Sequence, residues 1–232
     1  MRILDLFCGA GGAAVGYARA FPGNEIVGVD INPQPRYPFT FVQADAMTYP
    51  LDGFDFIHAS PPCQAFTSMK VMHNARKHHD LLTPTRQRLQ NQGSLWVIEN
   101  VIGAPMSAGP PSLLSDISGV MLCGSMFGLN NGEHELRRHR LFESSVPLPQ
   151  PTCRHRLSVV GFYGDHARTR QRTVNGHRHR GGDITGTERK LALVRDLMGI
   201  DWMTWHEANQ AIPPAYTEYI GHQLASFTQV AS

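Results

Sequence analysis

Cys63 occupies a position from which a thiol could act as a nucleophile. It follows a short apolar run, Phe54 to Ala59, and a Ser-Pro-Pro breaker. The run predicts a buried strand, and the two prolines stiffen the turn after it, so Cys63 is expected on a rigid loop at a strand end. Ligands bind at that edge of open α/β sheets. A thiol there could attack an electrophile if dipoles or positive charge lowered its pKa; a buried, purely structural cysteine is the alternative.

Glu99 is a second candidate, because it lies in the apolar run Leu95 to Asn100. Burial raises the pKa of a carboxyl group, so Glu99 could hold a proton near neutral pH and donate it to a substrate ring nitrogen. The alternative is an ion pair with an arginine in the core. Arg138 and Arg140 alternate along a predicted strand and therefore point to the same side, so they suit either interpretation.

A glycine-rich turn near the N-terminus has the spacing of a cofactor loop. Residues 9–14 follow an expected strand, open an expected helix and fit the loose pattern G-x-G-x-x-[GA], with Asp30 about twenty residues further on. The pattern predicts an adenosine-containing cofactor, without separating NAD, FAD and S-adenosylmethionine. A tight turn without a ligand is the alternative. Asp45, after a third expected strand, could accept a hydrogen bond from an adenine amino group; a helix cap or a surface acid is the alternative.

These residues need a scaffold that brings strand ends together. Strands are expected at Arg2 to Phe7, Glu25 to Asp30, Phe39 to Gln43, Phe54 to Ser60 and Leu95 to Asn100. Because helical patterns separate several of them, the chain is predicted to be α/β, with a doubly wound, mostly parallel sheet. The alternation then loosens. We expect a first segment at 1–146, a small loop-rich basic insertion at 147–188 that could include one hairpin, and helices in 189–232 that return to the first segment.

Charge is distributed unevenly along the chain. The 232 residues carry a net charge of only +2, yet nine Arg or Lys face three acidic residues between Pro151 and Lys190. That local balance of +6 indicates one basic face on a near-neutral body, suited to nucleic acid. No segment approaches the roughly 20 apolar residues that span a bilayer. We therefore expect a soluble, cytoplasmic protein that does not engage a membrane.

The cysteine pattern argues against a metal or a disulfide framework. Cys8, Cys63, Cys123 and Cys153 are widely spaced and include no Cys-x-x-Cys pair. Reduced thiols and the absence of a bound metal are therefore expected. The run His177-Arg-His-Arg180 could bind a metal, but a phosphate-contacting loop is favoured.

Four motifs together resemble the C5-cytosine-specific DNA methyltransferase family, and the chain length resembles its compact, phage-type members. The motifs are Asp5-Leu-Phe-Cys-Gly-Ala-Gly-Gly12, Ser60-Pro-Pro-Cys-Gln-Ala-Phe-Thr67, Ile98-Glu-Asn-Val101 and Arg138-His-Arg-Leu-Phe142. The resemblance covers about residues 3 to 143 and resumes weakly at Ala211 to Ala215. It implies the Rossmann-like sheet of S-adenosylmethionine-dependent methyltransferases, a monomer acting on double-stranded DNA, and a role such as restriction-modification.

The resemblance also implies roles for individual residues. Cys63 would attack C6 of a flipped-out cytosine, Glu99 would engage ring N3 and the exocyclic amine, and Arg140 would support the ring. Arg138 would help to hold Glu99 and the loop. The cofactor S-adenosylmethionine would contact Phe7, Gly9, Ala10, Gly11, Gly12, Asp30, Asp45 and Pro62. The nucleic acid would contact Gln64, Thr67, Arg168, Arg170 and Arg172.

Other functions stay open on the sequence. The same chemistry could act on cytosine in RNA of the tRNA type. A non-catalytic nucleic-acid-binding relative would not need Cys63, Glu99 and Arg140 together. A nicotinamide oxidoreductase would leave Pro-Pro-Cys-Gln and Glu-Asn-Val unexplained.

Overall fold

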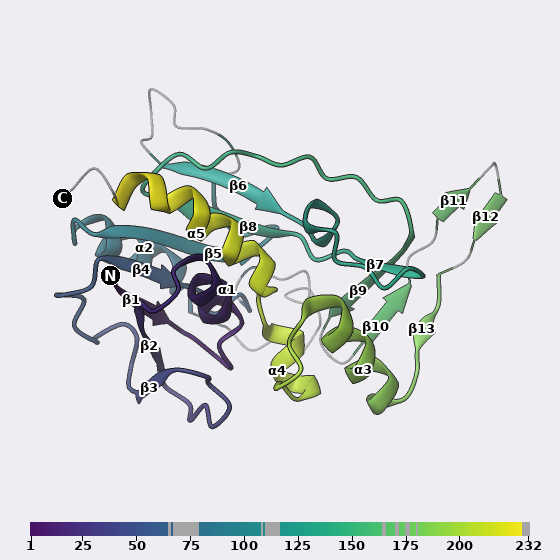
Figure 1. Ribbon diagram of the computed structural model, residues 1–232, viewed down its shortest axis with the longest axis horizontal. Coiled ribbons are helices and arrows are strands. Elements are labelled where there is room, and N and C mark those ends of the chain that lie inside the picture. The colour runs from purple at the N-terminus through teal and green to yellow at the C-terminus, as the bar shows by residue number, and fades with distance from the viewer. Residues whose placement is uncertain are drawn as a thin grey trace.

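The computed structural model describes residues 1–64, 66, 79–107, 109, 117–163, 166–169, 172–174, 177–179 and 181–228, with only the backbone described at 172–174, 177–179 and 228. Figure 1 shows the arrangement of its elements, a large sheet flanked by helices and a smaller region of short strands and helices beside it.

The large sheet has seven strands, and the expected alternation along the chain builds most of it. Its strands are β1 (Arg2–Leu6), β2 (Glu25–Asp30), β3 (Thr40–Gln43), β4 (Phe56–Ala59), β5 (Leu95–Val101), β6 (Ser118–Leu122) and β8 (Arg140–Ser144). They lie in the order β3-β2-β1-β4-β5-β8-β6. β8 is antiparallel to both of its neighbours, and the other pairings are parallel. The strand order reverses between β1 and β4, which is the switch point where such sheets bind ligands.

Helices cover both faces of this sheet, as the apolar strands require. On one face, α1 (Gly12–Ala20) packs against α5 (Pro214–Thr228), with Tyr17 and Tyr216 fully buried in a shared core. α2 (Leu82–Gln90) covers the other face through Leu82 and Leu89. The predicted doubly wound α/β fold is therefore confirmed. Among the described residues, no helix has both the length and the hydrophobicity that crossing a bilayer requires.

The predicted loop-rich insertion contains more regular structure than one hairpin. The strands outside the large sheet are β7 (His134–Leu136), β9 (Ser158–Tyr163), β10 (His166–Thr169), β11 (Arg172–Val174), β12 (His177–His179) and β13 (Asp183–Ile184). Four of them form a second sheet in the order β13-β10-β9-β7, and β11 pairs with β12 alone.

Two helices complete this small region. α3 (Thr187–Met198) and α4 (Trp205–Gln210) share a buried core with the second sheet, to which Leu136, Val160 and Leu197 contribute. Contacts therefore cross both expected limits of the insertion, because β7 precedes residue 147 and most of α3 follows residue 188.

Candidate active site

The expected catalytic side chains gather at one edge of the large sheet. Ala59, at the end of β4, pairs with Ile98 in β5, so the Ser-Pro-Pro-Cys loop begins beside Glu99. On the other side of β5, Arg140 pairs with Val101, two residues beyond Glu99 and on the same face. Strand register therefore brings three segments, separated by dozens of residues in the chain, to a common site.

Glu99 and Arg140 form a buried ion pair. Arg140 Nε lies 2.9 Å from Glu99 Oε1, and the two side chains are 14% and 8% exposed. Burial raises the pKa of Glu99, while the positive charges of Arg140 and Arg138 act in the opposite direction. The pair combines both interpretations from sequence, because Glu99 has an arginine partner and still has an elevated proton affinity.

Cys63 is half-buried on the loop after β4, and this loop is anchored from the next strand. Asn100 Nδ2 donates to the carbonyl oxygen of Pro61 at 2.9 Å. Burial is the main cause that raises the pKa of the Cys63 thiol, and the negative charge of Glu99 adds to it; Arg140 opposes both. The structure therefore does not supply the lowered pKa that was the condition for an activated Cys63 thiol.

A chain of buried hydrogen bonds reaches Glu99 from beneath the loop. The Tyr17 hydroxyl lies 2.9 Å from His58 Nδ1, and His58 Nε2 lies 2.8 Å from Ser60 Oγ. Ser60 in turn hydrogen-bonds to the Glu99 carboxylate, which lowers its pKa. Burial lowers the pKa of His58 to about 3, so its ring is neutral and can accept from Tyr17 and donate to Ser60. Sequence reasoning did not identify this chain of contacts.

The described hydrogen bonds of Arg138 go to main-chain carbonyl oxygens outside β5. Its guanidinium donates to the main-chain carbonyl oxygens of Ala211 at 2.9 Å, Asn209 at 2.6 Å and Phe162 at 3.4 Å. Burial and the neighbouring charge of Arg140 lower its pKa to about 9, so it stays cationic at neutral pH. Arg138 influences Glu99 through its charge, while its hydrogen bonds fasten the segment before α5.

The glycine-rich turn lies at the same edge, between β1 and α1. Asp30, at the end of β2, accepts a hydrogen bond from the backbone N–H of Gly9 at 3.1 Å. Gly11 has a φ of +83°, and a Cβ there would lie 2.7 Å from the Pro38 ring. Glycine is therefore required at this position for two independent reasons.

The C-terminal part of the chain closes over this turn. A Cβ on Gly12 would lie 2.4 Å from the carbonyl oxygen of Ile212, so that backbone passes directly over the start of α1. Trp202 Nε1 donates to the carbonyl oxygen of Ala10 at 2.8 Å. Trp202 therefore supports the glycine turn through a hydrogen bond.

The other expected cofactor residues follow the ends of β1, β3 and β4. Phe7 is half-buried with a φ of +57°, and Pro62 is exposed. Ile31, next to Asp30, is 65% exposed and was not among the expected site residues. Asp45 is an exposed acid that accepts from the backbone N–H of Met47 at 2.8 Å, in a turn rather than at the start of a helix.

Asp5 is an unexpected buried acid in β1, close to this edge. The Tyr37 hydroxyl donates to its Oδ2 at 3.2 Å, and its Oδ1 has no hydrogen-bond partner among the described residues. Burial raises the pKa of Asp5 well above its ordinary value.

The expected nucleic-acid contacts are only partly described. Gln64 is exposed beside Cys63. Arg168, on β10, forms an exposed ion pair with Asp183 on β13 at 2.9 Å. Thr67 and Arg170 lie outside the described residues, and Arg172 is described by its backbone in β11.

The fold is similar to that of solved methyltransferase structures, although no sequence-based comparison finds a relative. No family model matches the chain, and no curated protein matches it. Among solved structures, a prophage-encoded protein of E. coli described as a DNA modification methyltransferase is 14% identical with a TM-score of 0.54, each chain covered to 99%. A methyltransferase of Entamoeba histolytica is 11% identical with a TM-score of 0.58, over 99% of this chain and 98% of that one. The mixed α/β fold with its large, mostly parallel sheet matches these methyltransferase structures over nearly the whole chain.

Proposed function

We propose that this protein transfers a methyl group from S-adenosylmethionine to C5 of cytosine in DNA, through a covalent bond between Cys63 and C6 of a flipped-out base. The observation that carries the proposal is the convergence of Cys63, Glu99 and Arg140 at one sheet edge, beside a glycine turn with an acidic residue at the end of β2.

The residues suit the chemistry that cytosine requires. C5 is a poor nucleophile because it belongs to an aromatic ring. Attack of the Cys63 thiolate on C6, with a proton delivered from Glu99 to N3, converts C5 into a nucleophilic enamine carbon. Since burial raises the pKa of Glu99, this carboxyl can carry the proton that N3 receives. Once C5 carries the methyl group, loss of its remaining proton to a base, such as water, expels the Cys63 thiolate; N3 returns its proton to Glu99, and the aromatic ring is restored.

Arg140 has two roles in this scheme. It keeps the Glu99 carboxyl in place through the 2.9 Å contact, and its charge favours the thiolate form of Cys63. Ser60 and His58 position Glu99 from the opposite side. The thiol proton must leave before attack, since burial raises the pKa of Cys63 at rest.

The sheet edge fits an adenosine-containing group. Asp30 offers a carboxylate for ribose hydroxyls, and Ile31 beside it is an apolar side chain left 65% exposed. A Cβ at Gly9 would meet open space, so the turn leaves room for a ligand. Phe7 would cover the adenine ring, and Ala10, Gly11 and Gly12 would surround the methionine portion. When bound, S-adenosylmethionine supplies an electrophilic methyl group on a sulfonium centre.

The polymer is proposed to be double-stranded DNA. This rests on the family resemblance, on the basic stretch Pro151 to Lys190, and on the full-length structural similarity to a protein described as a DNA modification methyltransferase. A cytosine inside a duplex must leave the base stack before Cys63 can reach C6, at a cost of a few kcal/mol. Exposed basic side chains such as Arg168 would contact phosphates and make affinity fall with salt.

The test begins with expression in a methylation-free host, base-resolution mapping of 5-methylcytosine in its DNA, and mass spectrometry of digested tRNA from the same cells. An oligonucleotide carrying 5-fluorocytosine at the mapped position should then form a denaturation-resistant adduct with the wild-type protein and S-adenosylmethionine. Cys63→Ser should form none. Methylation confined to tRNA would move the substrate to RNA, and unmodified nucleic acids with no adduct would overturn the proposed function.

A further inference from the structure

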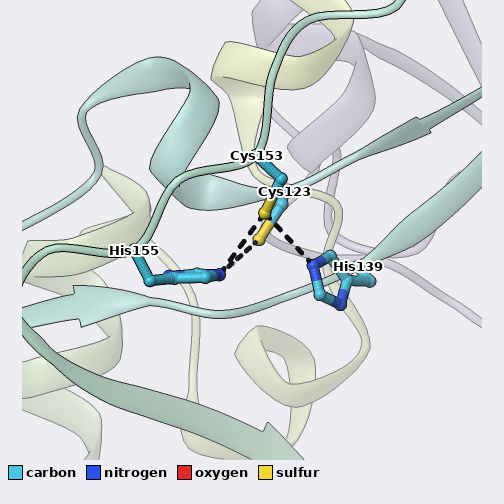
Figure 2. A group of neighbouring side chains, drawn as sticks. All are labelled: Cys123, His139, Cys153 and His155. Carbon is cyan, nitrogen blue, oxygen red and sulfur yellow. Dashed lines mark hydrogen bonds between the residues drawn. The ribbon is translucent and has the colours of Figure 1, made fainter.

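Four ligand-type side chains meet outside the candidate active site. They are Cys123, His139, Cys153 and His155, and one potential ligand atom from each lies within 4.8 Å of the other three. Figure 2 shows the two sulfur atoms close together, with the two imidazole rings directed toward them. Cys123 is fully buried and the other three are half-buried.

The separations within this cluster match a tetrahedral metal site. Cys153 Sγ lies 3.5 Å from both His139 Nε2 and His155 Nε2, and Cys123 Sγ lies 3.5 Å from His155 Nε2. Around tetrahedral zinc, bonds of about 2.3 Å to sulfur and about 2.0–2.1 Å to nitrogen place sulfur and nitrogen about 3.6 Å apart. The three sulfur–nitrogen separations therefore already have the value that one central zinc ion would impose.

A carboxylate orients one of the rings. His155 Nδ1 lies 2.7 Å from Glu135 Oε1, and Glu135 is itself buried and accepts from the Arg156 backbone N–H at 3.0 Å. With the Nδ1 proton directed at Glu135, the lone pair of His155 Nε2 faces the sulfur atoms. This carboxylate–histidine arrangement is the usual support of a zinc-bound imidazole.

Hydrogen-bond donors also surround the sulfur atoms. The backbone N–H groups of Ser125 and Arg138 donate to Cys123 Sγ, and Ser125 Oγ lies 3.3 Å from Cys153 Sγ. Such donors stabilise thiolates, the form in which cysteine binds metal. The alternative is a disulfide between Cys123 and Cys153, which are both free in this structure. A disulfide would not account for the two imidazole nitrogens that lie 3.5 Å from the sulfur atoms.

We propose that Cys123, His139, Cys153 and His155 bind one structural zinc ion. Two thiolates and two imidazoles are a donor set that zinc favours, and four protein ligands leave no open position for water or substrate. This assignment replaces the expectation of no metal, which rested on sequence spacing. The ligands are separated by 15, 13 and 1 residues, so no compact zinc motif appears in the chain.

The position of the site suggests what the metal stabilises. Cys123 follows β6, His139 lies between Arg138 and Arg140, and Cys153 and His155 lie on the connection from β8 to β9. A zinc ion would therefore cross-link three segments: the end of β6, the residues just before β8, and the connection that leads into β9. The binding of zinc does not depend on the proposed function; an effect on methyl transfer does.

The direct test uses the untagged full chain purified without added metal. Elemental analysis should find about one zinc ion per chain. Replacement with Co²⁺ should produce the visible absorption of tetrahedral cobalt together with thiolate charge-transfer bands. Cys153→Ser should lose both signals, while Cys63→Ser, the matched cysteine control, should retain them. Retention of full zinc content by Cys153→Ser would overturn the site.

A milder variant guards against misfolding. Glu135→Gln keeps all four ligands and should weaken zinc affinity about 10–100-fold in competition with a chelator. An unchanged affinity would exclude the proposed support of His155. In the wild type, Cys123 and Cys153 should resist alkylation until a chelator is added. A disulfide between them in the freshly purified protein, or a chain without zinc and without a cobalt spectrum, would overturn the proposal. Methyl transfer to DNA is measured on the same samples, so absence of the zinc site and failure of the proposed methyl transfer can be told apart.

Discussion

Arg140 Nε lies 2.9 Å from Glu99 Oε1, across two neighbouring strands that run in opposite directions. The contact places a cation beside a carboxyl group whose pKa burial raises. Glu99 thereby stays in a fixed orientation while keeping an affinity for a proton. Variants at these positions distinguish a catalytic role of this geometry from a purely structural one.

Cys63→Ser should abolish methyl transfer. A serine hydroxyl is a far weaker nucleophile at neutral pH, so the rate should fall by about 10³-fold or more. Binding of S-adenosylmethionine, measured by calorimetry, should stay nearly unchanged, because Cys63 lies on the β4 loop rather than in the glycine turn. Substantial residual turnover would remove Cys63 from the role of nucleophile.

Glu99→Gln should lower turnover by about 10²–10⁴-fold, because the amide cannot deliver a proton to N3. Cofactor affinity should change little.

Glu143→Gln provides the matched control for this variant. Glu143 is also a buried carboxylate on a central strand, and it pairs with Arg86 at 2.7 Å. Breaking either buried pair should cost about 3–5 kcal/mol of stability. Only Glu99→Gln should lose turnover beyond what its thermal stability explains; equal effects of the two variants would make Glu99 a structural residue.

His58 should make the protein sensitive to acid. Burial lowers its pKa to about 3 from an ordinary value of 6.5, so the unfolded chain binds a proton more readily than the native state does. His58 therefore lowers stability as pH falls from about 6.5 toward 3, by about 1.4 kcal/mol per pH unit. The free energy of unfolding, measured with denaturant at several pH values in this range, should depend on pH less steeply in His58→Gln, by that amount. The control is His166→Gln, which replaces an exposed histidine and should leave the pH dependence of the unfolding free energy as in the wild type.

Arg168 tests whether the small region contacts nucleic acid. If Arg168 neutralises one phosphate, Arg168→Gln should weaken DNA binding and reduce the log–log salt slope by about 0.9. Asp183→Asn, which removes its exposed partner, should strengthen binding. Arg2→Gln breaks a similar exposed pair with Glu25 in the large sheet, at the start of β1 and β2, and should leave binding unchanged. An unaltered slope in Arg168→Gln would place the DNA contacts elsewhere.

Much of the scaffold was predictable because its signals are local. The helices expected in 189–232 appear as α3, α4 and α5, with α3 beginning at Thr187, and the first five strands appear within a few residues of the expected positions. Apolar periodicity and glycine or proline breakers act over a few residues, so they are readable along the chain. The small second sheet was less readable, because its strands of two to six residues carry little periodicity.

The amino-acid sequence alone determined the α/β fold, the glycine turn, and the placement of Cys63 and Glu99 at strand ends. Each depends on residue type within a short segment. Only the tertiary structure decided that Arg140 rather than Arg138 contacts Glu99, that Tyr17 and His58 reach it through Ser60, and that two cysteines and two histidines share one cluster. These contacts join residues far apart in the chain, and sheet register and packing, rather than local periodicity, bring them together.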